Sequence, residues 1–587
     1  MADSEPDSFL NSTAKGEEGQ PSSDPSNGAE DESELDPLLA KLDPEQREAA
    51  SSLIGPTCII AGAGTGKTGT ITHRIAYGIS RGYYSANRVL ALTYTNKAAA
   101  ELRTRLRTLG VGEVAARTFH SAALAQLEYF WPQFTGARAP QVMEGKARLL
   151  ARLADERKLK VDTAALRDLA AEIEWRKFSM LSLDEYAALD RKAPAGLSKP
   201  RLLDLMVAYE DAKTAVNQID WEDVLILCLG MLRSEPRALA HVHQQFRFFT
   251  VDEYQDISPL QHALLDVWLG DRNDLCVVGD PNQTIYSFTG ATSRFLQTFA
   301  TRFENAKVVE LTRNYRSTKQ IVNFANRLTG GRAPMAGANL SPLESQGAIG
   351  LAPRLQAFNN AGDEANYVAH QVRTLLSEGV KPRQIAVLYR VNGQSEALEA
   401  ALANANVPYQ LRGGVRFFAR PEIQAALRAM NAEIAARIEK PTHKAVEEIC
   451  RGLGWSLREP DQVNGGAREK WESLGALIQI LDEMPDGISL EVFYRELLER
   501  SRSQHEPEAP AMTLATIHAA KGLEWDHVFI VGVNEGYLPI TYAKTEAEIA
   551  EENRLLYVGV TRARKTLMIS WNGTESRFVS LLRSTPN

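Results

Sequence analysis

Short runs of β-branched and other apolar residues alternate with longer amphipathic stretches along most of this chain. Strands that alternate with helices in this way are typical of parallel α/β sheets. We therefore expect an α/β protein with parallel sheets. The runs that predict strands are 89–93, 275–279, 308–311, 385–389, 512–517, 528–533 and 566–570.

The alternation stops twice, and long charged helices rich in alanine and leucine take its place. These stretches, 123–215 and 425–508, predict a largely helical insertion in each of two α/β domains. A chain of 587 residues also exceeds what one hydrophobic core supports. The expected segments are 39–122 and 216–308 for the first α/β domain, 309–424 and 509–587 for the second, and 1–38 for a tail.

Most of the net charge of −8 comes from the first 40 residues, which contain 11 acidic side chains and one base, Lys15. The other 63 acidic and 65 basic residues leave the rest of the chain near neutral. Residues 1–38 contain few large apolar side chains, so burial cannot offset the entropy of ordering them, and we expect a disordered acidic tail. This tail could bind a basic repair-protein partner, or it could act only as a solvated leader.

No apolar run has the length of a membrane span, and the acidic N-terminus does not resemble a signal peptide. We therefore expect no membrane contact and a cytoplasmic protein. The cysteines occur singly without a CxxC pair, which predicts reduced core residues rather than zinc or redox chemistry. They are Cys58, Cys228, Cys276 and Cys450.

A glycine-rich segment, AGAGTGKT at 61–68, follows an apolar run and precedes a stretch of helical character. Glycines let backbone N–H groups turn toward phosphate oxygens, while Lys67 would reach the β and γ phosphates and Thr68 would ligate Mg²⁺. A glycine-rich turn is the alternative, but the strand before and the helix after favour a phosphate-binding loop. Its predicted nucleotide-binding residues are Gly62, Ala63, Gly64, Thr65, Gly66, Lys67 and Thr68.

Two adjacent carboxylates end a second apolar run, in the segment VDEYQD at 251–256. Asp252 is placed to hold Mg²⁺, and Glu253 to orient the water that attacks the terminal phosphate. Together with the loop, this pair predicts hydrolysis of a nucleoside triphosphate, and it favours a motor over a switch.

Twelve motifs in order identify a resemblance to the UvrD/Rep/PcrA branch of superfamily 1 DNA helicases, over about 42–580. SFTGA and DPNQT are most similar to the second UvrD-type helicase of actinobacteria. The resemblance implies two RecA-like P-loop NTPase domains, each with a largely helical insertion, 1B and 2B. The motifs are LDPEQ, AGAGTGKT, ALTYTNKAA, TFHS, DWEDV, VDEYQD, VVGDPNQTIYSFTGA, LTRNYRS, IAVLYRVNGQSEALE, RGGVRFFARPEI, TLATIHAAKGLEW and EENRLLYVGVTRAR.

The resemblance also implies roles around ATP. Gln46 would read the adenine edge, Tyr315 would stack on the base, and Glu524 would hold the ribose. Gln283 would sense the γ-phosphate, while Arg316 and Arg562 would act as arginine fingers from the second domain. Each arginine could instead be a surface or interdomain salt-bridge residue.

Aromatic residues just beyond two strand ends predict contact with single-stranded DNA. The rings of Tyr94, Tyr286 and Phe288 can stack on bases without reading sequence, although hydrophobic packing is the alternative. Hydroxyl, amide and imidazole groups nearby would face phosphates or transmit domain closure. They are Thr93, Asn96, His120 and His518.

The resemblance therefore predicts a 3′ to 5′ translocase and helicase that uses ATP and Mg²⁺ in repair or recombination. We expect it to act on single-stranded and forked DNA, as a monomer or weak dimer associated with the nucleoid. Gly69, Thr289 and a second insertion of only about 85 residues depart from the family pattern. They motivate an alternative, a nucleotide-gated motor that strips or recruits proteins with little unwinding of its own.

Overall fold

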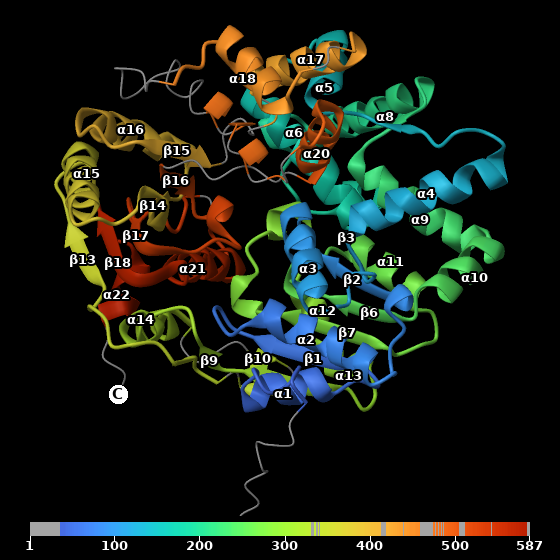
Figure 1. Ribbon diagram of the computed structural model, residues 1–587, viewed down its shortest axis with the longest axis horizontal. Coiled ribbons are helices and arrows are strands. Elements are labelled where there is room, and N and C mark those ends of the chain that lie inside the picture. Colours follow the sequence, from blue (N-terminus) through green and yellow to red (C-terminus); the bar gives the residue numbers. More distant parts are fainter. Residues whose placement is uncertain are drawn as a thin grey trace, which may run out of the picture.

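The computed structural model describes residues 36–583 except for short gaps at 162, 330–333, 336–337, 340, 413–417, 419, 438–439, 458–472, 476, 479, 483, 485–486, 504–510 and 542. The predicted disordered tail lies outside the described residues, apart from its last three positions. Figure 1 shows one sheet with its helices at the lower right, a second sheet at the left, and both helical insertions at the top.

The first sheet has six parallel strands in the order β3-β2-β6-β7-β1-β8. Neighbouring residues of β1 pack into two separate cores, Cys58 and Ile60 into one and Ile59 and Ala61 into the other. Because successive side chains of a strand point to opposite faces, a sheet covered on both sides needs continuous apolar runs. The strands are β1 Thr57–Ala61, β2 Val89–Thr93, β3 Ala115–Thr118, β6 Phe248–Val251, β7 Leu275–Gly279 and β8 Lys307–Leu311.

The predicted boundary between the two α/β domains, at residue 309, is wrong because it cuts through strand β8. This strand pairs with β1 along its whole length, so residues 309–311 belong to the first sheet and not to the second domain. The helices around this sheet are α1 Pro44–Ser51, α2 Lys67–Ser80, α3 Asn96–Thr108, α9 Trp221–Ser234, α10 Pro236–Gln245 and α11 Pro259–Leu269.

The second sheet is also parallel, in the order β13-β18-β17-β14-β16-β15. The expectation of two parallel α/β sheets is therefore confirmed, with β17 starting three residues before the predicted run. Its strands are β13 Arg354–Ala357, β14 Ile385–Tyr389, β15 Tyr409–Arg412, β16 Met512–Thr516, β17 Trp525–Ile530 and β18 Ala563–Trp571, and its main helices are α14 Lys319–Thr329, α15 Ala361–Ser377, α16 Ser395–Asn404 and α21 Glu546–Val560.

Each insertion has a hydrophobic core of its own. Helix α4, Phe119–Thr135, leaves the first sheet, and α5 Ala147–Glu156, α6 Thr163–Phe178, α7 Leu183–Ala188 and α8 Lys199–Ala215 follow. The described helices of the second insertion include α17 Pro421–Ala435, α18 Thr442–Gly452 and α20 Leu490–Ser503, and α20 lies against α3 of the first domain.

The four cysteines are buried and free, as predicted. Within the described part of the chain, no helix combines the length and the apolar character that crossing a membrane requires.

A buried charge network joins the first insertion to the first sheet domain. Lys177 of α6 lies 2.8 Å from Glu210, 2.8 Å from Asp220 and 2.7 Å from Asp223, and Lys213 contacts the same three carboxylates. Burial would raise the pKa of Asp220, but the two lysines outweigh it and hold that pKa below its usual range. Although the carboxylates lie within 4.8 Å of one another, the lysines already supply the cations that a metal would otherwise provide.

Replacing Lys177 with methionine should destabilise the protein by about 3 to 5 kcal/mol, because it leaves buried carboxylates short of a counter-charge. Chemical denaturation followed by circular dichroism measures the loss. The matched control is Lys160→Met at an exposed position, which should change stability little. Equal effects of the two substitutions would contradict a structural role for the network.

Candidate nucleotide site and DNA groove

The loop between β1 and α2 has the backbone geometry of an anion site. Gly64 and Gly66 have φ of 73° and 82°, a region that favours glycine. A Cβ on Gly66 would lie 2.6 Å from Gln46 Nε2, and one on Gly64 would lie 2.5 Å from Asn314 Nδ2. Helix α2 begins at Lys67 without a side-chain cap, which leaves its first N–H groups to bind an anion.

Two carboxylates follow β6 beside this loop. Asp252 Oδ1 accepts a hydrogen bond from the backbone N–H of Glu253 at 2.9 Å, and Glu253 has a φ of 52°, which is unusual for a residue other than glycine. Burial and the neighbouring Glu253 raise the pKa of Asp252 to about 7. Burial also acts to raise the pKa of Glu253, but Lys67 and Lys521 outweigh it and hold that pKa at about 2.

Three buried carboxylates, Asp252, Asp256 and Asp280, gather here with the partly buried Glu253, and Lys67 and Lys521 face them. Burial is the main cause that raises the pKa of Asp280, and it also raises that of Asp256 to about 6, with a smaller contribution from the charge of Glu253 in both cases. Buried carboxylate oxygens suit a hard divalent cation such as Mg²⁺. Asp252, together with Thr68 at the start of α2, is the donor set that fits this ion.

Lys521 is a residue of this site that the sequence analysis missed. Its Nζ forms an ion pair with Asp256 and donates to the carbonyl of Gln283 at 2.6 Å. The same Nζ lies 4.9 Å from the centre of the Tyr286 ring. The sequence did contain a signal for it, because Lys521 lies between two predicted site residues, His518 and Glu524.

Arg562 is the more enclosed of the two predicted arginine fingers, with 1% of its surface exposed. Its guanidinium donates to the carbonyls of Val558 and Leu523 at 2.8 and 3.1 Å and to Gln283 Oε1 at 3.4 Å. Among the residues that the structure describes it forms no ion pair, so the salt-bridge alternative does not account for it. Burial and Arg316 lower its pKa to about 9.

Arg316 lies between the two domains. Its Nε is 2.5 Å from Glu524 Oε2, and its Nη1 donates to the carbonyl of Thr561 at 3.2 Å. A Cβ on Gly64 would lie 2.7 Å from the Arg316 Cβ, so this arginine borders the phosphate loop. Glu524, predicted to hold a ribose, is therefore engaged by Arg316 in this conformation.

The predicted adenine-binding residues meet at the other end of the loop. Gln46 Nε2 donates to the carbonyl of Thr65 at 2.9 Å, and its Oε1 accepts from the N–H of Asp43 at 3.2 Å. Tyr315 is half exposed and donates its hydroxyl to Asp43 at 2.6 Å. Asp43, the N-cap residue of α1, thus holds both the Gln46 amide and the Tyr315 ring beside the phosphate loop.

The second domain closes over the phosphate loop. Asn314 Nδ2 donates to the carbonyl of Ala63 at 2.6 Å, and Arg554 of α21 donates to the carbonyl of Thr284 at 2.9 Å. The side chain of Leu343 would crowd a Cβ on Gly62. Residues from both domains therefore surround the place expected for the triphosphate.

The predicted DNA-stacking residues form one cluster. The rings of Tyr94 and Tyr286 stack with centroids 5.5 Å apart, and Phe288 meets Tyr286 at 6.1 Å and His518 at 5.7 Å. Phe288 is 54% exposed and Tyr94 is 36% exposed. Rings from separate motifs are thus brought together across the domain boundary, with Lys521 between them and the carboxylates.

A cavity of about 710 Å³ adjoins this cluster and is lined by both domains and the first insertion. The insertion contributes Trp175 and Arg191, whose guanidinium lies 3.9 Å from the centre of the Trp175 ring. The sequence analysis missed both, since a tryptophan within a charged helix gave no sign of facing the other domains. The cavity also includes Ser287, Phe288, Arg390 and His518.

The prediction that Thr93 faces DNA is wrong. The Thr93 side chain is 1% exposed, and its Oγ1 is buried without a hydrogen-bond partner among the described residues. Its position at the end of β2 turns it into the domain, whereas the next residue, Tyr94, points outward. Asn96 is partly exposed at the start of α3.

Of the two predicted histidines, His518 lines this cavity, whereas His120 lies in the first turn of α4. Burial and Lys146 lower the pKa of His120 to about 4, and burial, Arg390 and Lys521 lower that of His518 to about 3. Edge contacts with Phe178 and Trp221 enclose the His120 ring. At neutral pH either imidazole could meet a phosphate only as an N–H donor and not as a cation.

Comparison with known proteins matches nearly the whole chain. Residues 42–304 match the UvrD/REP helicase N-terminal domain, and 309–460 and 432–574 match the UvrD-like helicase C-terminal domain. ATP-dependent DNA helicase UvrD2 of Mycobacterium tuberculosis is 43% identical over 91% of this chain and 79% of its own length. DNA helicase II of Escherichia coli is 29% identical over 92% and 85%, and ATP-dependent DNA helicase PcrA of Bacillus subtilis is 28% identical over 91% and 83%.

Proposed function

This chain belongs to the UvrD-like family of ATP-dependent DNA helicases, and from that premise we propose that it moves 3′ to 5′ along single-stranded DNA and unwinds forked DNA in repair or recombination. The observation that carries the proposal is the position of Lys521. It touches the Tyr286 ring on the groove side and Asp256 and Gln283 on the nucleotide side. DNA bound at the Tyr286 ring and nucleotide bound beside Asp256 and Gln283 would therefore act on the same group, the Lys521 ammonium.

Hydrolysis would use residues of both domains. Glu253 stays ionised and would accept a hydrogen bond from the attacking water, which turns the water lone pair toward the terminal phosphate. Arg316 and Arg562 would stabilise the negative charge that develops on the phosphate oxygens. Gln283, bonded to both Arg562 and Asp280, would report the presence of that phosphate to the second domain.

Substrate binding would use the rest of the cleft. Lys67 and the N–H groups of Gly62 to Thr68 would hold the phosphates, and Gln46, Tyr315 and Glu524 would hold the adenosine. Thr68 and Asp252 would ligate Mg²⁺, which when bound neutralises phosphate charge. The raised pKa of Asp252 supports this assignment, because a buried carboxylate gains most from a nearby cation.

DNA movement would follow from domain closure. Tyr94, Tyr286 and Phe288 would stack on bases in the cavity between the domains, while Asn96, His120 and His518 would contact the backbone. The continuous ring cluster supports one grip shared by both domains rather than two separate grips. Closure and reopening at the nucleotide site would change the spacing within that grip and advance the strand.

The first experiment is steady-state ATP hydrolysis with and without unstructured single-stranded DNA, with Lys67→Ala as the control for contaminating ATPases. We expect strong stimulation that the substitution removes. Absence of stimulation by DNA would contradict the proposal. Unwinding of a 3′-tailed fork beside displacement of streptavidin from single-stranded DNA then tests the finer activity, since displacement without unwinding favours the protein-stripping alternative.

Replacing Lys521 with methionine should reduce the ratio of DNA-stimulated to DNA-free ATP hydrolysis about tenfold, because Lys67 still holds Glu253 ionised in the DNA-free reaction. The substitution removes a charged hydrogen bond and a cation–π contact, together worth about 1.5 kcal/mol or more. Lys565→Met, an exposed lysine of the same domain that pairs with Asp526, is the matched control. Equal loss of DNA-free and DNA-stimulated hydrolysis would argue against a linking role for Lys521.

A further inference from the structure

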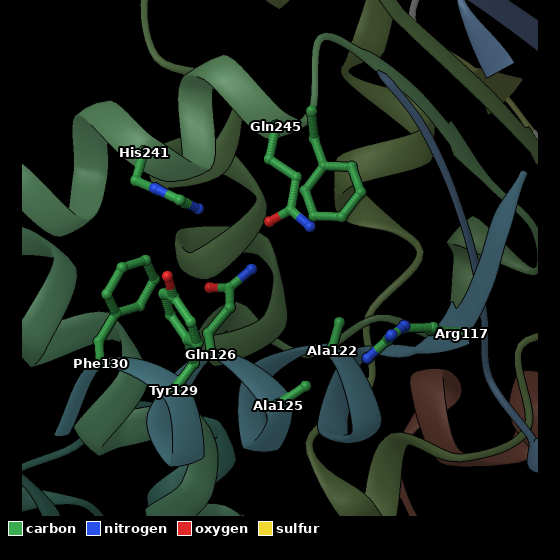
Figure 2. Close-up of a pocket in the computed structure, with 9 residues that line it drawn as sticks. Arg117, Ala122, Ala125, Gln126, Tyr129, Phe130, His241 and Gln245 are labelled. Carbon is green, nitrogen blue, oxygen red and sulfur yellow. The ribbon is translucent and has the colours of Figure 1, made fainter. Parts of the chain in front are cut away.

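A second cavity lies on the first domain between helices α4 and α10, and it shares no lining residue with the groove cavity. Its volume is about 310 Å³, at the lower end of the range for ligand pockets. Figure 2 shows side chains from the two helices that point into one space. Its polar or aromatic lining residues include Arg117, Gln126, Tyr129, Phe130, His241 and Gln245.

Gln126 is the central group of this pocket. It is 6% exposed, and its Oε1 accepts hydrogen bonds from Trp268 Nε1 at 2.9 Å and from Cys228 Sγ at 3.4 Å. These two donors fix the orientation of the amide, so its Nε2 has to point the other way. In the part of the chain that the structure describes, Nε2 has no partner, and Figure 2 shows the amide directed into the pocket. Two N–H donors on a nearly buried side chain are therefore left for a ligand.

The other polar groups of the pocket are also neutral or cationic. Arg117 at the end of β3 is exposed, and its guanidinium forms no hydrogen bond or ion pair with any described residue. Gln245 and His241 face the same space from α10. Among the residues that the structure describes, none with a carboxylate lines the pocket. Such a donor-rich lining favours a ligand with a negatively charged acceptor.

Apolar surface forms the rest of the lining. Phe130 and Phe246 are buried, and Ala122 adds a methyl group. His241 packs on the Tyr129 ring at 5.6 Å and meets Phe130 edge-on at 5.3 Å. Because these rings contact one another, they leave an apolar recess and not an open slot between two parallel faces.

We propose that this pocket binds a short peptide segment of a partner protein, with an apolar side chain in the recess and a carboxylate on the Gln126 amide and Arg117. A nucleobase is less well matched, since it would need a stacking slot, and its edges present donors as well as acceptors. A nucleic-acid backbone would need several cations, whereas the described lining residues supply one permanent cation, Arg117. The site would recruit a partner to the motor without occupying the nucleotide cleft or the DNA groove.

The test is fluorescence anisotropy of the full-length protein with the peptide fluorescein-Gly-Ser-Gly-Ser-Phe, in which the C-terminal carboxylate is the only carboxylate of the peptide part. The same peptide with a C-terminal amide should bind about tenfold more weakly, because a charged acceptor is lost. A version ending in alanine should also bind more weakly. Equal binding of the acid and the amide, or no saturable binding up to about 1 mM, a limit that corresponds to about −4 kcal/mol, would overturn the proposal.

Substitutions of lining residues test whether the peptide binds in this pocket. Arg117→Gln and Tyr129→Ala should each weaken the free-acid peptide about tenfold, and Gln126→Glu should do the same while it keeps the acceptor for Trp268. The matched control is Arg138→Gln, at an exposed arginine outside the pocket. Melting temperature and DNA-stimulated ATP hydrolysis should stay at the wild-type level for Arg117→Gln and Tyr129→Ala. Unchanged peptide binding in both of these variants would overturn the assignment.

Two competitors test whether the pocket binds DNA or a small carboxylate instead of a partner peptide. Displacement of the labelled peptide by oligothymidylate would make the site part of the DNA path. Displacement by phenylacetate with an affinity equal to that of the peptide would make it a small-molecule site. Either result would overturn the proposal of a partner peptide, whereas resistance to both competitors supports it.

Discussion

Replacing Glu253 with glutamine should lower the kcat of ATP hydrolysis by a factor of about 10² to 10⁴ and leave ATP binding close to that of the wild type. The carboxylate is held ionised by Lys67 and Lys521, whereas the amide cannot accept a proton from the attacking water. The measurement is single-turnover hydrolysis beside equilibrium binding of a fluorescent ATP analogue, both with saturating single-stranded DNA.

The control for Glu253 is Glu304→Gln at an exposed position, which should retain normal turnover. Asp252→Asn provides the contrast inside the site, since loss of this ligand should weaken Mg²⁺-dependent ATP binding as well as turnover. Near-normal hydrolysis by Glu253→Gln would contradict its role in positioning water.

Replacing Arg562 with lysine should lower kcat by a factor of about 10³ or more, since contributions of arginine fingers reach about 10³ to 10⁵. Its guanidinium uses separate nitrogens for the carbonyls of Val558 and Leu523 and for Gln283, and one ammonium group cannot reproduce that geometry. The measurement is the kcat of DNA-stimulated hydrolysis, with the melting temperature as a check on folding.

Arg564→Lys is the matched control for Arg562. It lies two residues further along the chain, at the start of β18, its side chain is about half exposed, and its nearest ionic contact, Glu524, is 3.5 Å away. We expect its kcat to stay within a few fold of the wild-type value. If both substitutions had the same small effect, Arg562 would have a structural role and not a catalytic one.

The strand predictions succeeded because both sheets are covered on both faces, so a buried strand reads as an unbroken apolar run. They missed the partly exposed edge strands β3, β13 and β15, and they placed the start of β17 too late. Asp526 and His527 interrupt the apolar pattern there, but Asp526 is bonded to Lys565 and Gln384, and His527 to Thr566. Partners from elsewhere in the fold satisfy these polar groups, so the strand continues where the local sequence predicts an end.

For the residues of the DNA groove, too, the local sequence did not show which parts of the chain meet in the fold. The sequence identified Tyr94 and Tyr286 separately, but their mutual stacking depends on how β2 and β7 are ordered in the sheet. Thr93 was grouped with Tyr94, although neighbouring residues at a strand end face opposite sides. Trp175 was missed because its neighbours in the cavity come from three parts of the chain.

The sequence by itself determined the nucleotide loop, the acidic pair and the order of the α/β elements, because these depend on local backbone needs and on apolar runs. Glycine at Gly64 and Gly66 is required by the backbone whatever surrounds the loop. Only the tertiary structure decided that Lys521 meets Asp256, 265 residues away, and that Gln126 is locked by Trp268 with its amide free. Such contacts arise from chain crossings and helix packing, and a single sequence carries no local signal of them.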